Sequence, residues 1–163
     1  MYNTWMANTE QKTQKISALL NKAGVELIIK EFPQSTRTAQ EAADVIGCSV
    51  VQIAKSLIFK SESNQAVLVI ASGINRVDTE KVIELTGENI GKADAEFVLE
   101  KTGFIIGGVP PFGHKTPLTP LIDKDLLKYD EIWASAGTPN SVFKIQPRDL
   151  INITNGKVAD IKS

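Results

Sequence analysis

The sequence predicts a single domain of the α/β (α+β) class, in which helices pack against one mixed β-sheet. Three observations support this prediction: a length of 163 residues, a hydrophobic content of 42%, and an alternation of helical and strand patterns along the chain. A chain of this length fits one domain, and this apolar content is enough to form a buried core. No internal repeat or shift in composition marks a second domain.

Four segments carry helix signals, which are apolar residues at helical spacing, N-terminal capping residues and glycines just past the end. We expect these helices at residues 9–23, 38–46, 78–86 and 94–102. The clearest start is the capping box of Thr38 and Glu41. Residues 1–8 combine polar residues with isolated Tyr2 and Trp5, and we expect them to form a flexible N-terminal extension before a domain of residues 9–163.

Strand signals fall between and after these helices, as short β-rich apolar runs bounded by glycine, proline or polar residues. We expect strands at residues 25–29, 54–60, 66–71, 104–106, 118–122, 131–134 and 142–145. The polar residues 61–65 separate two of these runs in the pattern of a hairpin or of neighbouring strands, and we expect that pair to form the middle of the sheet. Residues 87–93 are expected to form a turn.

Charge and cysteine content restrict the classes of partner and compartment. With 18 basic and 19 acidic side chains the formal charge is -1, so any contact with nucleic acid must come from a local patch. The single Cys48 cannot form an internal disulfide, and no apolar run is long enough to cross a bilayer or to serve as a secretory signal. We therefore expect a cytoplasmic protein with no membrane partner.

Lys55 is the first candidate for chemistry. Strand alternation places it on the same face as Ile53, Leu57 and Phe59, which are apolar. Burying an ammonium is costly unless the group is paired or its pKa falls, so a lysine held there is either functional or extends its amine to the edge. A pairing of Lys55 with an internal carboxylate is the structural alternative.

A loop rich in glycine and proline, residues 107–114, is the second candidate. Gly107, Gly108 and Gly113 allow a ligand to approach the backbone closely, and the prolines stiffen the chain between them. Backbone N–H groups in such a loop can stabilise an oxyanion, and its carbonyls can hold an attacking water. A tight connection between strands with no ligand explains the pattern equally well.

His114, the only histidine in the chain, follows this loop. One imidazole does not indicate a metal site of the usual kind, and we expect neither a metal nor a cofactor. A lone histidine after a glycine is more often a hydrogen-bonding loop residue than a general base, and no Ser/His/Asp triad can be assembled around it. Basic side chains are candidates for a phosphate-binding rim, although the acidic residues among them favour an ordinary solvated surface. They are Lys12, Lys15, Lys22, Arg37, Arg76, Lys81 and Lys115.

Taken together, several motifs resemble the YbaK/ProX family of prolyl-tRNA-synthetase-associated editing domains. They are Thr-Ala-Gln-Glu-Ala-Ala at 38–43, Gly-Cys at 47–48, Ile-Ala-Lys-Ser-Leu at 53–57, the loop 107–114 and Ser-Ala-Gly at 135–137. The resemblance covers most of the chain, and the lysine and glycine loop together are far more specific than either alone. It implies a compact domain with a mixed, barrel-like sheet that acts as a monomer.

The resemblance also implies an enzyme that hydrolyses the ester of wrongly charged aminoacyl-tRNA, acting in trans on the 3′ acceptor end. Lys55 would be the principal functional side chain, with Gly107 and Gly108 holding the scissile ester and a water, and no metal or cofactor would be used. The residues expected to bind substrate are Phe32, Ser56, Pro110, Phe112, Gly113, His114, Ser135 and Gly137. Ser35, Thr36 and Val51 are further candidates for the pocket wall.

The substrate is narrowed only to a small amino acid, Ala, Ser, Thr or Cys, on tRNA for proline or a related tRNA. Ser56 stands where some subgroups carry threonine, and the residues after Gly137 lack the aspartate that the Cys-specific subgroup tends to have. These departures weaken a Cys assignment. A synthetase is a further candidate partner, and DNA is not expected as one. The alternative function is a non-catalytic module that binds aminoacyl-tRNA or a synthetase.

Overall fold

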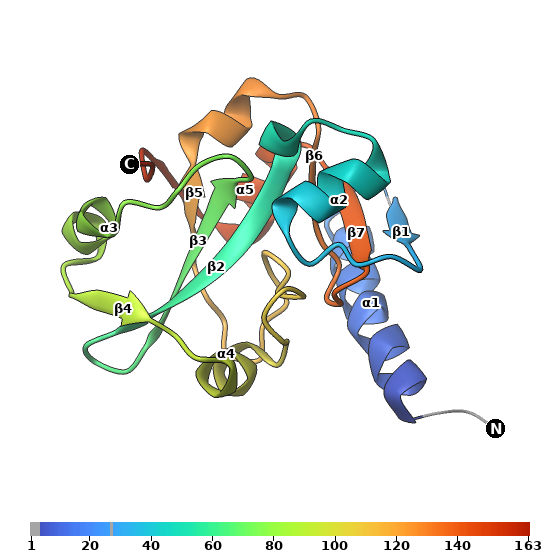
Figure 1. Cartoon of the computed structure of the whole chain (residues 1–163), viewed down its shortest axis with the longest axis horizontal. Coiled ribbons are helices and arrows are strands. Elements are labelled where there is room, and N and C mark those ends of the chain that lie inside the picture. Colours follow the sequence, from blue (N-terminus) through green and yellow to red (C-terminus); the bar gives the residue numbers. More distant parts are fainter. Residues whose placement is uncertain (1–3, 27) are drawn as a thin grey trace.

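Helices and strands alternate along the chain around one central sheet (Figure 1). A computed structural model describes residues 4–26 and 28–163, with side chains described from Gln11 onward. The helices are α1 (Thr4–Lys22), α2 (Ala39–Ile46), α3 (Thr79–Thr86), α4 (Ala95–Thr102) and α5 (Pro147–Thr154), and the 3-10 turns are η1 (Val50–Gln52) and η2 (Lys124–Lys128). The strands are β1 (Ile29–Glu31), β2 (Ile53–Ser61), β3 (Ala66–Ser72), β4 (Ile90–Lys92), β5 (Leu121–Asp123), β6 (Ile132–Ser135), β7 (Ser141–Ile145) and β8 (Lys157–Ala159). The expected single domain of mixed class is confirmed.

The strands form one mixed sheet with the path β1-β7-β6-β2-β3-β5-β8, and β4 pairs with β2 off this path. β2 and β3 form a long antiparallel hairpin that starts with Lys60 opposite Ala66 and continues to Ala54 opposite Ser72. This hairpin runs diagonally through the centre of Figure 1. β6 joins β2 in parallel, and β5 joins β3 in parallel. The hairpin is therefore the middle of the sheet, as expected.

The side of β2 that faces away from β3 is shared by two strands that lie at its opposite ends. β6 pairs with β2 at Ile53 and Ala54, whereas β4 pairs with it at residues 59–61. No strand of the described part of the chain pairs with this side at residues 55–58. At about 3.3 Å per residue, the opening from Ala54 to Phe59 is roughly 16 Å long.

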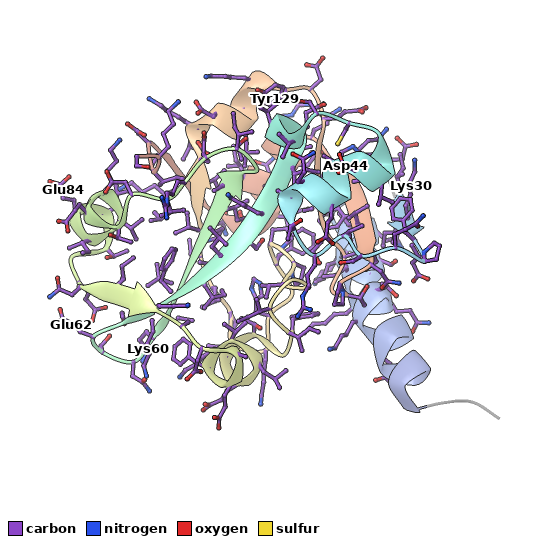
Figure 2. All side chains as sticks on the ribbon, in the orientation of Figure 1. Lys30, Asp44, Lys60, Glu62, Glu84 and Tyr129 are labelled. Carbon is purple, nitrogen blue, oxygen red and sulfur yellow. The ribbon has the colours of Figure 1, made fainter. Side chains whose placement is uncertain are left out.

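The core occupies both faces of the central hairpin. In β3, Leu68 and Ile70 pack into the largest apolar cluster, while Val69 and Ala71 point to the other face and pack into a cluster beneath α3. Removal of these side chains from water is the main favourable contribution to folding. Charged side chains such as Asp44 and Glu84 lie on the outside of the molecule (Figure 2). None of the described helices is both long enough and apolar enough to cross a membrane.

Three helices begin and end where capping signals predicted. The side chains of Thr38, Asp78 and Asp94 accept hydrogen bonds from backbone N–H groups of the first turn. These bonds satisfy donors that have no partner inside the helix. Each helix ends at a glycine with left-handed backbone; they are Gly47, Gly87 and Gly103. The helix starts and ends of α2, α3 and α4 were thus predictable from local chemistry.

The N-terminal helix is longer than expected. α1 begins at Thr4 rather than at Thr9, so the expected flexible extension of residues 1–8 is helical from Thr4 onward. Its residues 1–3 lie outside the described residues. Trp5, Met6 and Ala7 follow one another directly, so the apolar residues of this segment do not show the helical spacing that predicts a helix.

The prediction of a strand at residues 104–106 was wrong. After Gly103, the Phe104 backbone N–H donates to Thr102 Oγ1 at 3.0 Å, so the chain turns back on the end of α4 instead of extending. Phe104 is buried, whereas Ile105 and Ile106 are exposed. Local hydrogen bonding to Thr102 outcompetes the β preference of these apolar residues.

Several short elements did not follow the expected boundaries. β1 spans residues 29–31 instead of 25–29, and β5 spans 121–123 instead of 118–122; β4 lies where a turn was expected, and α5 and β8 were not predicted. Strands of three residues are too short to show alternation. α5 begins with Pro147 at its first position, which is a helix-start signal, but its N-cap residue is Gln146 instead of Ser, Thr, Asp or Asn, and its side chain makes no capping hydrogen bond.

Gly73 marks the closest approach between the end of β3 and η1. A Cβ atom at this position would lie 2.3 Å from the carbonyl oxygen of Val50 and 2.9 Å from the Cβ of Ala39. Only glycine lets the two segments of backbone come this close.

Gly73→Ala should therefore lower the free energy of unfolding by about 1–3 kcal/mol, because the added methyl group must displace backbone. Urea denaturation of wild type and variant measures the difference. Gly91→Ala is the matched control, since no heavy atom lies within 4 Å of its added Cβ, and we expect it to change stability by less than about 0.5 kcal/mol. Equal stability of the two variants would contradict this account of the approach.

Candidate functional site

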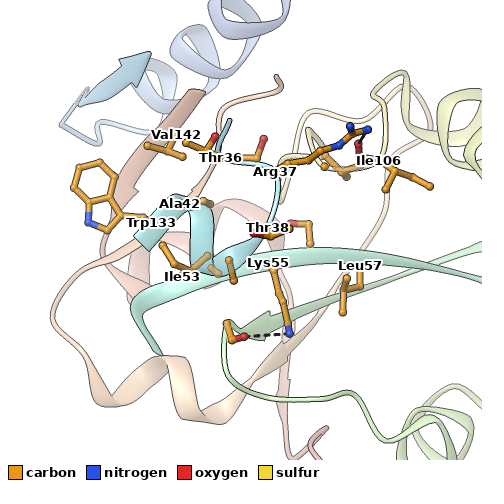
Figure 3. A pocket seen from close by; sticks show the side chains of 18 of the residues that line it. Thr36, Arg37, Thr38, Ala42, Ile53, Lys55, Leu57, Ile106, Trp133 and Val142 are labelled. Atoms are coloured by element: carbon orange, nitrogen blue, oxygen red, sulfur yellow. Dashed lines mark hydrogen bonds between the residues drawn. The ribbon is translucent and has the colours of Figure 1, made fainter. Parts of the chain in front are cut away.

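A cavity of about 670 Å³ lies beside the open stretch of β2 (Figure 3). Its walls come from β2, from residues 36–40 and Ala42 at the start of α2, from the end of β6, and from Ile106, Gly107 and Val109 after α4. Trp133 and Arg37 mark opposite parts of the wall in Figure 3. A cavity of this size falls in the range of sites that bind small molecules.

The backbone of β2 presents hydrogen-bonding groups to this cavity. The Ser61 N–H donates to the Gln65 carbonyl across the hairpin, so the alternation of an antiparallel ladder turns the N–H and C=O groups of Ser56 and Ile58 to the other side. Both residues line the cavity. The opening in the sheet thus supplies fixed donors and acceptors to a ligand.

Lys55 extends from β2 into the cavity and is half-buried. Its Nζ donates to the carbonyl oxygen of Gly73 at 3.3 Å, the dashed line in Figure 3. Burial lowers the pKa of Lys55 below its ordinary value, and the negative charge of Asp123 opposes this effect. No carboxylate of the described residues forms an ion pair with it within 4.0 Å. The lysine charge is therefore available to a ligand.

The cavity is lined by positive charge only. Among the described lining residues, Lys55 and Arg37 are the charged side chains, and no Asp or Glu joins them. Arg37 crosses Gly107 so closely that a Cβ on this glycine would lie 2.3 Å from Arg37 Cγ, and Arg37 Nη2 donates to the Ile106 carbonyl at 3.4 Å. The N-terminus of α2, which carries a partial positive charge, also opens here through Thr38. The site favours an anionic or electron-rich ligand.

Ser56 contributes an unsatisfied polar atom. Its Oγ is buried and has no hydrogen-bond partner in the described part of the chain. Its side chain lies on the opposite face of β2 from Lys55, because successive residues of a strand alternate. A buried hydroxyl without a partner costs about 1–3 kcal/mol, a penalty that a polar ligand group can offset.

The structure brings together four of the residues predicted for the site, Lys55, Ser56, Gly107 and Ser135, all of which line the cavity. Ser135 Oγ accepts a hydrogen bond from the Gly137 N–H at 3.2 Å, which shapes the turn after β6. Thr36, a candidate wall residue, also lines the cavity.

The other predicted residues lie behind the cavity wall. Phe112 is in the main core, where its ring meets the ring of Phe143 edge-on with centroids 5.5 Å apart. Phe32 packs against a second apolar cluster, and its carbonyl accepts a hydrogen bond from Asn140 Nδ2 at 2.8 Å. The remaining ones pack the loops against α1, Phe104 and each other; they are Gly108, Pro110, Gly113, His114 and Gly137. These residues support the loops that carry Gly107 and Ser135.

His114 fastens the glycine loop to itself. Its Nε2 donates to the Pro110 carbonyl at 2.7 Å, and its ring meets the ring of Phe104 edge-on. Because the partner is a carbonyl, the proton is assigned to Nε2. Burial lowers the pKa of His114, the hydrogen bond to Pro110 raises it, and the charge of Lys15 lowers it further. The histidine is buried and does not line the cavity.

Several lining residues were not singled out from the sequence. Trp133 of β6 joins Ile53, Ala42 and Val142 in an apolar wall at one end of the cavity, and Gly73 receives the Lys55 hydrogen bond. The sequence predicted a strand at Trp133, and the structure shows that this residue is buried and faces the cavity. Among the described residues, no group of three or more His, Cys, Asp or Glu side chains could hold a metal ion.

A second hollow, of about 590 Å³, lies between η2 and the start of α5. Leu127, Tyr129, Pro147 and Ile151 contribute to its walls. It contains none of the residues predicted for the site.

Comparison with known proteins links this arrangement to a family. The family described as an aminoacyl-tRNA editing domain matches residues 33–153. The uncharacterized protein YwhH of Bacillus subtilis (strain 168) is 34% identical over 130 residues, which cover 80% of this chain and 83% of that protein. A crystal structure of a proposed trans-editing enzyme for prolyl-tRNA synthetase is 45% identical, with a TM-score of 0.86 over 93% of this chain and 97% of that chain. The crystal structure of hypothetical protein APE2540 is 29% identical, with a TM-score of 0.85 over 91% and 99%.

The buried position of His114 predicts a pH-dependent stability. Because its pKa is lowered in the folded state, the unfolded chain binds more protons below about pH 6.5, and the free energy of unfolding should fall as the pH falls from about 7 to 5. Urea denaturation across this range measures the slope. His114 is the only histidine, so His114→Gln should flatten it, whereas an equal slope in the variant would show that other groups cause it.

Proposed function

Because this chain belongs to the aminoacyl-tRNA editing domain family, we propose that its cavity hydrolyses the ester of mischarged tRNA and releases a small amino acid. The observation that carries this proposal is the Lys55 ammonium, free of any ion pair with the described carboxylates, beside the open edge of β2. A polarised ester needs positioning and charge stabilisation more than it needs a strong nucleophile. The cavity offers both.

The volume of the cavity limits how much of the aminoacyl-tRNA can enter it. About 670 Å³ is enough for a terminal adenosine with its attached amino acid but not for a helical acceptor stem. The stem would remain outside, against the rim that carries Arg37. The apolar wall of Trp133, Ala42 and Val142 suits the aliphatic part of the ligand.

In the proposed reaction, water attacks the ester carbonyl carbon and negative charge develops on the carbonyl oxygen. Lys55 Nζ, together with backbone N–H groups of the β2 edge and of Gly107, stabilises this charge. The bond from carbon to the ribose oxygen then breaks. The products are the free amino acid and a tRNA with a free terminal hydroxyl, which takes up the proton that the water loses.

The proton acceptor is not a carboxylate or an imidazole of the cavity wall, since the described lining residues include neither. We assign proton transfer to the vicinal hydroxyl or the α-amine of the substrate, or to a backbone carbonyl of the β2 edge. His114 is committed to the Pro110 carbonyl. The proposed reaction therefore needs no side-chain general base.

The proposal extends to the identity of the amino acid that is released and of the tRNA that carries it. Ala, Ser, Thr and Cys all fit a cavity of this volume, and one methyl group changes binding by only about 1–3 kcal/mol. The similarity to a proposed trans-editing enzyme for prolyl-tRNA synthetase supports tRNA for proline, and supports a synthetase as a partner. A monomer acting in the cytoplasm, where tRNA is charged, fits this role.

A non-catalytic module that binds aminoacyl-tRNA or a synthetase is the second candidate. The absence of a side-chain general base among the described lining residues favours it. Binding of mischarged tRNA without release of the amino acid would distinguish this function from hydrolysis.

Lys55→Ala should abolish release of amino acid from tRNA that is mischarged with Ala, Ser, Thr or Cys, while leaving the protein folded. Loss of the ammonium removes the stabilisation of the oxyanion, for which we expect a decrease in rate of roughly 10²–10³-fold. Release of radiolabelled amino acid measures the rate for each substrate. Lys92→Ala, on the exposed strand β4, is the control. Full activity of Lys55→Ala would overturn the role given to this lysine.

The rim of the cavity should bind the phosphates of the acceptor stem. Lys12 and Lys15 of α1 both lie over the ring of Phe104, with Nζ 5.9 Å from its centroid. Gly137, close to the Ser135 wall, packs against Lys12, and Arg37 crosses Gly107. Arg37 lines the cavity, and we expect Lys12 and Lys15 to extend this basic rim from the side of Phe104 and Gly137.

Replacing Lys12, Lys15 and Arg37 by glutamine should weaken tRNA binding and reduce its dependence on salt. Each lost phosphate contact lowers the slope of log K against log salt by about 0.7–0.9. Fluorescence titration at several salt concentrations measures both quantities. Lys157→Gln, on β8 at the far edge of the sheet, is the matched control. An unchanged slope in the triple variant would place the tRNA on another surface.

A further inference from the structure

Asp123 is a buried carboxylate that the proposed reaction does not use. Only 1% of its surface is exposed, and it forms no ion pair with the described cations. Its Oδ2 accepts hydrogen bonds from the Ser72 N–H at 3.0 Å and from Asn75 Nδ2 at 2.7 Å, and its Oδ1 accepts from the Asp125 N–H at 2.9 Å. A buried charge held only by neutral donors is costly to maintain, which calls for a functional reason.

The hydrogen bonds of Asp123 hold the turn that receives Lys55. The carboxylate binds both ends of residues 72–75, through the Ser72 backbone and the Asn75 side chain. The Asn75 N–H also donates to the Ser72 carbonyl, and Ser72 Oγ donates to the Val51 carbonyl. Gly73, in the middle of this turn, accepts the hydrogen bond from Lys55 Nζ. Asp123 therefore fixes the carbonyl that orients the lysine.

The sheet register also places the two charges on one face. Ala71 in β3 lies opposite Lys55 in β2, and the parallel pairing of β3 with β5 brings Asp123 level with Ala71 on its other side. Lys55 and Asp123 thus flank Ala71 on the same face, with Cα atoms two strand spacings, or roughly 10 Å, apart. Asp123 is buried and Lys55 is half-buried, so solvent screens the attraction between their charges less than it would between two exposed groups.

A neighbouring carboxylate takes up the nearby cations. Asp125 pairs with Lys162 at 2.8 Å and with Lys128 at 3.0 Å, and shares the Asn75 amide with Asp123. Hydrogen bonds from Lys162, Asn75 and Lys128 lower the pKa of the Asp125 carboxyl. Both lysines form their ion pairs with Asp125. The charge of Asp123 acts on Lys162 as well as on Lys55, but Asp123 forms an ion pair with neither.

We propose that Asp123 is a positioning residue for Lys55: it fixes the Gly73 carbonyl that binds the lysine ammonium and faces this ammonium with a buried negative charge. The proposal rests on the proposed function for its kinetic consequence, but its structural part does not. Arg37 is the other charged side chain that lines the cavity among the described residues, and its Nη2 donates to the Ile106 carbonyl. The direction of the Lys55 pKa is consistent with this arrangement, because Asp123 raises the pKa that burial lowers.

The test compares Asp123→Asn with Asp125→Asn, which are equal changes in charge at neighbouring positions. NMR titration of the Lys55 side chain, with its signal assigned from Lys55→Ala, should give a lower pKa in Asp123→Asn than in wild type, and a smaller shift in Asp125→Asn. The deacylation rate of Asp123→Asn should fall roughly ten- to a hundredfold, and its decline at high pH should begin at a lower pH. Asp123→Glu, which keeps the charge, should restore part of the Lys55 pKa and part of the deacylation rate.

A Lys55 pKa that is unchanged in Asp123→Asn, or shifted no more than in Asp125→Asn, would overturn the proposal. The titration needs no tRNA, so a wild type that releases no amino acid would refute the proposed function and leave this result standing. If Asp123→Asn does not fold, Asn75→Ala replaces it, because this variant removes one tie between the turn and Asp123 without changing any charge. It should reduce the rate several-fold while Lys55 titrates as in wild type, and an unchanged rate would overturn the positioning role.

Discussion

The open edge of β2 is the constraint on which the rest of the site depends. β6 leaves β2 after Ala54 and β4 joins it only at Phe59, so the backbone between them has no strand partner on this side in the described chain. An unpaired edge in the middle of a sheet is a liability unless something covers it. Here the start of α2 and the segment 106–109 close over the gap, and the covered gap becomes a cavity with fixed hydrogen-bonding groups.

Most of the glycine loop, residues 107–114, supports the cavity wall without lining the cavity. Gly107 lies on the wall under Arg37, but Phe112, Gly113 and His114 face the core and α1. Their packing gives the loop one conformation, and a loop that is fixed before the ligand arrives loses little entropy on binding. Lys55 is fixed from its other side, through Gly73 and the turn that Asp123 holds. The site is thus made of rigid parts, although much of it is loop.

Much of the fold could be predicted from the sequence because its signals are local. The hairpin of β2 and β3 follows from two apolar runs around a polar turn, and the caps at Thr38, Asp78 and Asp94 define three helices. The strands β4 and β8 could not be predicted, because three residues show no period and their pairing is set by tertiary contacts. The strand predicted at residues 104–106 does not form, because the Phe104 N–H donates a hydrogen bond to Thr102 Oγ1 and the chain turns there.

For the site, the sequence singled out Lys55, because a charge on an apolar strand face is unusual. It did not indicate Gly73, Trp133 or Asp123, since these residues meet Lys55 or the cavity only through strand pairing. The order of strands in the sheet was not readable from any local pattern. The residues that hold Lys55 in place therefore could not be predicted without knowing that β5 pairs with β3.

We propose that the cavity beside β2 receives the aminoacyl end of tRNA. The most direct measurement is an NMR titration of the protein with a non-hydrolysable 3′-aminoacylamino-3′-deoxyadenosine, in which an amide replaces the ester. Our account predicts that the signals of Lys55, Ser56 and Gly107 shift together as the analogue binds. Shifts confined to the hollow of Leu127, Pro147 and Ile151 would contradict it.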